Sequence, residues 1–406
     1  MRSSAFLVLN VLGWMALATP AGARSADEDD IGTRPAGAAI AVDGSEGRDT
    51  REQKVLDAPP CTAPGCGPGA PPSPDLVVAE ERPSNWYVLD AGLRTHRDTF
   101  VGIATLAAAQ SRTERFYGVA SLSLIRNDAG SHYGVAQLAL GRNLSDELGG
   151  VAQVSLGENR ARYFYGLGQL TLGHNRSQEF GGVLQLAGYN RAQSFAGLMQ
   201  LGGYNLTDES FAGALQLGGY NRSAGSFVGL AQIGVVNGQG KGLFESRGDD
   251  TELWALGQFG LLNYANEFRG VAQVGAMSAA HDFSGGLQIG LFAGAETFRG
   301  LAQIGAASIS ERSTGGQLGL ANLAFEQHTG AQLGGGNYAQ TLHGVQLGAV
   351  NVGDRVSGVQ IGLFNHAKRL RGLQIGLLNH AEDGVLEWSP LLNMGFDEAK
   401  PQVGSL

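Results

Sequence analysis

A glutamine that recurs every 14 to 16 residues is the feature that most constrains the fold of this chain. Each copy reads roughly aromatic-x-Gly-x-x-Gln-apolar-Gly/small-x-x-Asn, and Thr105 and Ser121 hold the glutamine position in the first two of eighteen copies. One insertion, at 238–253, lengthens a single step to 26 residues and is either a recognition loop or a tolerated surface insertion. A regular short period is typical of an architecture in which each copy is one structural unit.

Within each copy, apolar and polar side chains alternate with a period of two. In residues 133–143 (YGVAQLALGRN), Leu138 and Leu140 lie on one side of an extended chain, and Gln137 lies on the other. Charged residues collect between the copies, and no copy carries a charge at its centre. Such alternation indicates a β-strand rather than a helix. The sequence therefore predicts an all-β domain of tandem 14–16-residue strand repeats over residues 84–396.

The favoured interpretation is an up-and-down antiparallel outer-membrane β-barrel of roughly 16–20 strands. Ten extended residues rise about 33 Å and, at a tilt near 45°, cross about 23 Å, which matches the apolar band of such a barrel. Leu138, Leu156 and Leu363 would then face outer-membrane lipid. The glutamines would form a polar face that lines the lumen, or would pair with one another across strands. This face comprises Gln137, Gln153, Gln169, Gln185, Gln200, Gln216, Gln232, Gln360 and Gln374.

A parallel β-solenoid with one repeat per coil is the alternative, and it would stack identical residues on one another. The difficulty for the solenoid is to close each coil. The four to six residues between two strands reach only about 20 Å, so they cannot bring the chain back along a ten-residue strand of about 33 Å. The strand would have to break at a central glycine such as Gly202 or Gly362. Asn351 and Asn365 distinguish the folds: they lie at opposite ends of neighbouring strands in the barrel, but stack about 4.8 Å apart in the solenoid.

The residues before and after the repeats predict an exported protein. Residues 1–23 have the features of a signal peptide, with Arg2 followed by an apolar run at 5–18 and a small-residue cleavage site. Residues 24–82 are rich in Pro, Gly and Ala without apolar periodicity, which predicts a disordered linker. Residues 397–406 form a C-terminal tail.

No arrangement of residues predicts catalysis, a cofactor or a metal site. Cys61 and Cys66 are candidates for a disulfide in an oxidising compartment, and they lack further ligands for a metal. His366 and His380 hold equivalent positions one copy apart and would lie close together in a solenoid. A net charge of −9 argues against a nucleic-acid partner, which needs a basic surface. The sequence thus predicts that the protein is not an enzyme.

Several copies resemble a known repeat family. GVQLGAVN (344–351), GVQIGLFN (358–365) and GLQIGLLN (372–379) resemble the tandem surface repeats of leptospires and myxobacteria, and EWSPLLNMGF (387–396) resembles the end of such proteins. The resemblance is sharpest after residue 313, and it implies placement in the outer membrane or at the cell surface without a known biochemical activity. The expected function is that of a passive pore or structural envelope protein; the alternative is a secreted β-solenoid scaffold for adhesion or protein interaction. The sequence identifies no extracellular ligand.

Overall fold

The computed structural model describes residues 86–240 and 251–396. The predicted signal peptide, the linker with Cys61 and Cys66, and the C-terminal tail lie outside the described residues. In the described part of the chain, no helix is long and apolar enough to cross a membrane.

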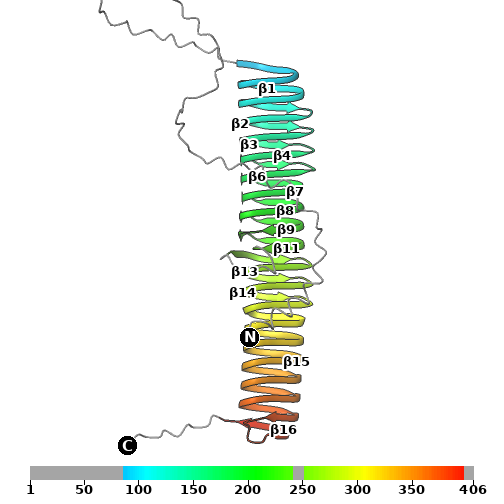
Figure 1. Ribbon diagram of the computed structural model, residues 1–406, viewed down its shortest axis with the longest axis vertical. Helices are drawn as coiled ribbons and strands as arrows, with labels where there is room; N and C mark the ends of the chain where they lie inside the picture. The colour runs from blue at the N-terminus through cyan, green and yellow to red at the C-terminus, as the bar shows by residue number, and fades with distance from the viewer. Residues whose placement is uncertain (1–85, 241–250, 397–406) are drawn as a thin grey trace, which may run out of the picture. The chain divides into compact units, whose positions relative to one another are not determined.

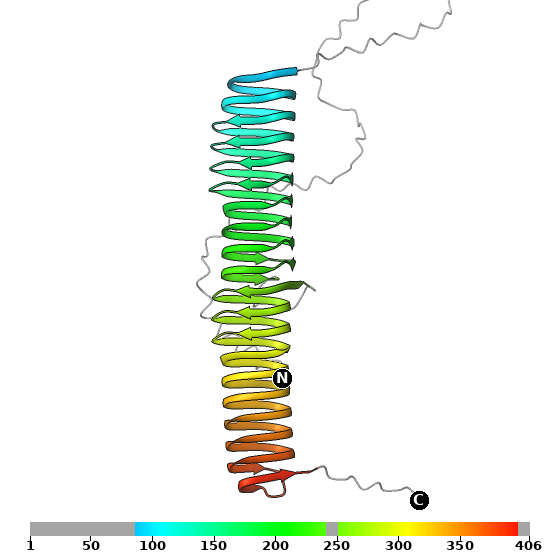
Figure 2. The same ribbon diagram turned by 180° about the vertical axis from the view of Figure 1, so that it is seen from behind.

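Consecutive copies stack on one another as parallel strands in one continuous sheet, so the repeat domain is a parallel β-solenoid (Figures 1 and 2). Gln137 in β2 pairs in register with Gln153 in β3, and the same like-on-like register continues along the stack. The β15 strand runs through several successive coils without a break. The strands are β1 (Trp86–Ser123), β2 (Arg126–Ala139), β3 (Arg142–Val154), β4 (Glu158–Tyr165), β5 (Gly168–Leu170), β6 (His174–Gly181), β7 (Leu184–Ala196), β8 (Met199–Ala212), β9 (Leu215–Ser223), β10 (Ser226–Val228), β11 (Ala231–Gln239), β12 (Glu252–Phe259), β13 (Leu262–Val274), β14 (Met277–Ile289), β15 (Phe292–Ala381) and β16 (Trp388–Gly395).

The prediction of an antiparallel barrel is therefore wrong, and the solenoid that was the alternative is the fold. Asn351 donates a hydrogen bond from Nδ2 to Oδ1 of Asn365 at 2.8 Å, which is the stacked arrangement. The coil closes within one copy because the chain does not run through it as one straight strand. A coil of 14–16 residues has a perimeter of only about 50 Å, and the chain bends more than once within it.

Each coil has three short extended sides, as the burial pattern of the copy 346–359 shows. Gln346, Asn351 and Val356 point inward, and the alternation of inward and outward residues slips by one residue between these sides. The last bend falls at Gly358, which has a φ of 146°. Only glycine adopts this conformation readily, and an added Cβ would also overlap the carbonyl oxygen of Gly344 in the preceding coil.

The glutamines form an unbroken ladder of side-chain amides inside the solenoid. From Gln153 to Gln374, each Nε2 donates to Oε1 of the glutamine one coil earlier, at 2.6–3.0 Å. The bond from Gln258 to Gln232 spans the insertion, so the coils on both sides of 241–250 keep their register. The insertion thus interrupts the sequence pattern without interrupting the stack.

The asparagines form a second ladder that runs in the opposite direction. Each Nδ2 donates to Oδ1 of the asparagine one coil later, at 2.8–3.1 Å, from Asn127 to Asn263 and again from Asn322 to Asn379. The same amides also donate to backbone carbonyls of the next coil. Buried amide groups are thereby satisfied within each run, and the exceptions among the described residues are Asn322 Oδ1 and Gln374 Oε1, which lie at ladder ends.

Aromatic rings hold the third side of the interior in most coils up to Phe298, and Leu342, Val356 and Leu370 hold it in later coils. Phe164, Phe180, Phe195, Phe211 and Phe227 stack with centroid distances of 4.6–5.0 Å and interplanar angles of 1–4°. Their side chains are almost fully buried. Stacking at this spacing follows from the separation of about 4.8 Å between paired strands.

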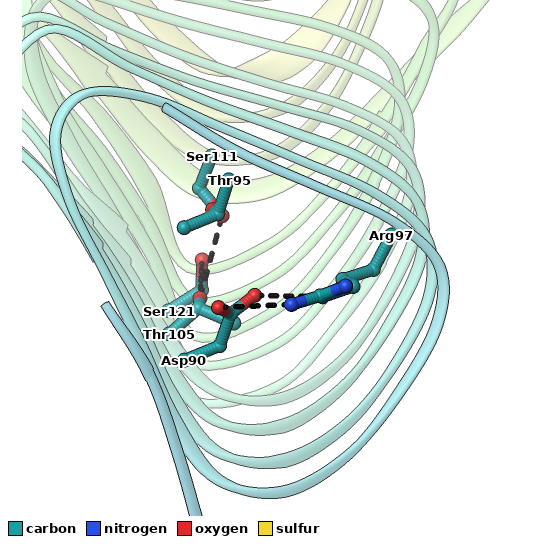
Figure 3. Close-up of polar contacts among 6 residues, drawn as sticks. All are labelled: Asp90, Thr95, Arg97, Thr105, Ser111 and Ser121. Atoms are coloured by element: carbon teal, nitrogen blue, oxygen red, sulfur yellow. Dashed lines mark hydrogen bonds and ion pairs between the residues drawn. The ribbon is translucent and has the colours of Figure 1, made fainter. Parts of the chain in front are cut away.

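The two ends of the solenoid are closed differently. At the N-terminal end, hydroxyl groups replace the amide ladders, and Arg97 bonds Asp90 across the open interior at 3.0 and 3.3 Å (Figure 3). The hydroxyl network joins Thr95, Ser111, Thr105 and Ser121. At the C-terminal end, β16 turns back and pairs antiparallel with β15, which covers the edge of the last coil.

Candidate functional site

The reactive polar side chains of the interior are buried and cannot contact a substrate from solution. His132 and His328 occupy positions of the aromatic stack and are almost fully buried, and burial lowers the pKa of each to about 4. Ser313 Oγ lies 2.7 Å from Nδ1 of His328, the distance expected of a nucleophile and its base. Both side chains are buried, however, so no substrate reaches this hydroxyl.

His366 and His380 lie together as a solenoid requires. Their rings stack with centroids 4.9 Å apart, and their Nδ1 atoms are 2.7 Å apart. The ring of His380 also stacks on Trp388 of β16 at 4.1 Å. Burial, and then the neighbouring His380, lower the pKa of His366. Across the described residues, no cluster of three or more His, Cys, Asp or Glu side chains has the arrangement of a metal site.

The glutamines of the predicted polar face lie in the interior of the solenoid. Each side chain is fully buried in the amide ladder and is not available to a ligand from solution. Their apolar neighbours point outward, on the opposite side from the glutamines as the alternation predicted, and are not part of the core of the solenoid. Leu140, Leu156 and Leu363 are 54–58% exposed.

These outward side chains make up one continuous surface, which we call the uncharged face. It consists, in every copy, of the outward residues from two positions before the glutamine position to four positions after it. None of the eighteen copies has Asp, Glu, Lys or Arg anywhere in this seven-residue window. More than half of the surface of many large apolar side chains on this face is exposed: Ile103, Leu124, Ile125, Leu140, Leu156, Leu167, Leu172, Leu198, Leu230, Val235, Leu256, Leu261, Val271, Leu291, Leu301, Leu320, Leu363 and Leu377.

The uncharged face carries an interrupted ridge, with a groove beside it near each end. The ridge consists of the large side chains three positions after the glutamine position, such as Leu140 and Leu377, and it is interrupted where this position holds glycine or alanine, as at Gly188, Gly203 and Gly219. Near the N-terminal end, a groove of about 680 Å³ lies between this ridge and the side chains one position after the glutamine, such as Leu138. Near the C-terminal end, a groove of about 770 Å³ occupies the same place, with Gly348 and Gly362 among its lining residues.

The charges of the repeat domain lie on the other two sides of the coil, where they form ion pairs. Arg191 lies 2.9 Å from Asp208, and Lys368 lies 3.0 Å from Asp354. The described residues contain 18 Lys and Arg and 20 Asp and Glu, a net charge of −2. The repeat domain is therefore nearly neutral, with its charges segregated from one long apolar surface.

No protein-family model, curated protein or solved structure matches this chain. The uncharged face could have been found in the sequence, because the absence of charge around each glutamine is visible there. What the sequence did not reveal is that the glutamine, and not its apolar neighbours, points inward.

Proposed function

We propose that this protein is an exported, non-enzymatic scaffold of the cell surface that binds a partner through the uncharged face. The single observation that supports it best is the absence of charge from this face in all eighteen copies, together with the exposure of its apolar side chains. A contiguous apolar surface of this length is typical of an interaction site.

The size of the face supports the proposal. Eighteen coils at about 4.8 Å extend about 85 Å, and seven residues at about 3.3 Å extend about 20 Å, which gives an area on the order of 1,500 Å². The largest apolar patch on a typical soluble monomer is about 300–600 Å². Water contact with so much apolar surface is unfavourable, so covering it with a partner releases free energy.

The core suits a scaffold. Hydrogen-bonded ladders of identical side chains hold each coil to its neighbours, and each coil contacts mainly the next one. His328 and Ser313 are buried, so this hydroxyl–imidazole pair does not contact a substrate from solution. The predicted signal peptide and the resemblance to surface repeats support export, and both remain predictions.

The proposal is tested first by location. Protease added to intact cells that produce the protein should digest it, and high salt or urea should release it without detergent. A periplasmic control protein should stay intact in the same cells. Protection of the chain from external protease would contradict surface placement.

The binding face is tested separately with the purified full chain. We expect the folded chain, diluted until the face is not covered by a partner, to bind an apolar dye such as ANS, and Leu156→Glu with Leu363→Glu to reduce the fluorescence severalfold. Val228→Glu is the matched control, because Val228 is 53% exposed but lies outside the uncharged face. An equal effect of the control would show that the face is not a distinct apolar surface.

A further inference from the structure

We infer that the partner of the uncharged face is a second copy of this chain, packed face to face about a two-fold axis. The inference rests on the proposed function, because it names the occupant of the same face. Its first support is spacing. Within an uninterrupted run of the ridge, such as Leu124 to Leu172 or Leu363 to Leu377, the exposed side chains repeat at the separation of paired strands, about 4.8 Å. A second chain presents the same period, so a contact made at one coil of such a run is repeated at the neighbouring coils.

Shape supports the same partner. The ridge formed by Leu140, Leu156 and their equivalents stands beside a groove at the N-terminal end, and Leu363 and Leu377 stand beside a groove at the C-terminal end. Each chain therefore carries both the projecting ridge and the groove that receives the ridge of the other chain. An interface of this kind is self-complementary, which is the requirement for a two-fold dimer.

Area and charge are also consistent with self-association. A standard stable interface buries about 800 Å² per partner, and the uncharged face offers more than this. The described residues have a net charge of only −2, and none of their charges lies on the face, so two copies do not repel one another there. Binding to an anionic membrane surface would instead call for Lys and Arg around the apolar residues. The window around each glutamine contains none.

The experiment measures the mass and the cross-section of the purified full chain. We expect sedimentation equilibrium to give a dimer, and small-angle X-ray scattering to give a cross-section with twice the mass per length of a single solenoid. Leu156→Glu with Leu363→Glu should weaken the dimer about 100-fold or more, because the two-fold axis places each carboxylate in the buried interface twice. Val228→Glu, of matched exposure, should leave the dimer unchanged.

Four results would overturn the inference. The first is a monomer at all concentrations that still binds ANS, which would leave the proposed binding face intact but with another occupant. The second is a monomer that floats with phosphatidylcholine vesicles, which would identify a lipid surface as that occupant. The third is a dimer with the mass per length of one solenoid, since that would be an end-to-end contact. A monomer that binds neither dye nor vesicles would also overturn the proposed function.

Discussion

Replacing one glutamine of the ladder tests whether the interior of the solenoid is dry. Gln153 donates from Nε2 to Oε1 of Gln137 at 2.8 Å, and its own Oε1 accepts from Nε2 of Gln169 at 2.8 Å. Its side chain is fully buried. Gln153→Leu keeps much of the volume but leaves the two neighbouring amides each without a partner. At about 1–3 kcal/mol for each orphaned group, we expect a loss of about 2–6 kcal/mol.

In Gln153→Glu the new side chain has nearly the same shape as glutamine, and its carboxyl group makes the stability depend on pH. A protonated carboxyl still has one O–H to donate and one oxygen to accept, so it repairs the ladder at low pH. Burial raises the pKa of this carboxyl above its unfolded value of about 4.3. The stability is therefore present in full below about pH 4.3 and is lost as the pH rises toward the raised pKa of the folded state. The loss is about 1.4 kcal/mol for each pH unit, or about 3.7 kcal/mol at pH 7 if the folded pKa exceeds 7.

The measurement is urea unfolding of the full chain, followed by circular dichroism, at pH 4 and pH 7. The wild-type difference between the two pH values is subtracted from that of each variant. We expect a large residual pH dependence for Gln153→Glu and almost none for Gln153→Leu. A Gln153→Glu variant as stable as the wild type at pH 7 would mean that water reaches the interior, and the dry-ladder reasoning would be refuted.

Three further outcomes follow from other parts of the core. Gly358→Ala should lower the free energy of unfolding by about 2–5 kcal/mol, because φ is 146° and the new Cβ meets the preceding coil, whereas Gly336→Ala, with open space around it, should cost less than about 1 kcal/mol in the same urea titration. Burial lowers the pKa of His132 to about 4, below its value of about 6.5 in the unfolded chain, so the free energy of unfolding of the wild type falls as the pH falls between these two values. Relative to the wild type, the free energy of unfolding of His132→Phe should therefore rise by about 2 kcal/mol from pH 7 to pH 5, and a pH-independent difference would contradict this. Deleting 382–396 removes β16 and exposes the edge of the last coil, so light scattering should show end-to-end association that the Leu156→Glu and Leu363→Glu substitutions do not prevent.

The strand content and the period could be predicted from the sequence, but the direction of the strands could not. Alternation around Gln137 indicates an extended chain equally well in a barrel and in a solenoid. The stacking of His366 on His380 was expected only within the solenoid alternative, and the structure confirms it. The straight-strand estimate of closure led to the wrong choice, because positive φ at glycines such as Gly372 is not visible as a bend in a pattern of apolar and polar letters.

The sequence also did not show that the glutamine side chains point into the core, for a related reason. The usual rule places leucine inside and glutamine outside. In a parallel stack in register, however, each residue lies against its own equivalent, so an amide can both donate to and accept from an identical amide at the strand spacing. Gln216 gains two such bonds in the interior, whereas leucine at that position would gain only contact area. A pattern read one copy at a time does not contain this pairing.

The ladders also bear on why the outer surface is available for binding. Much of the interior is filled by amides such as Gln346 and Asn351, which stabilise it through hydrogen bonds between coils. The fold therefore does not require that Leu363, on the outer surface, be apolar or even uncharged. Charged residues are accepted freely on the other two sides, as Arg191 and Asp208 show. Their absence from the outward positions of the same window in eighteen copies has no explanation in the packing of the core, and an interaction surface explains it directly.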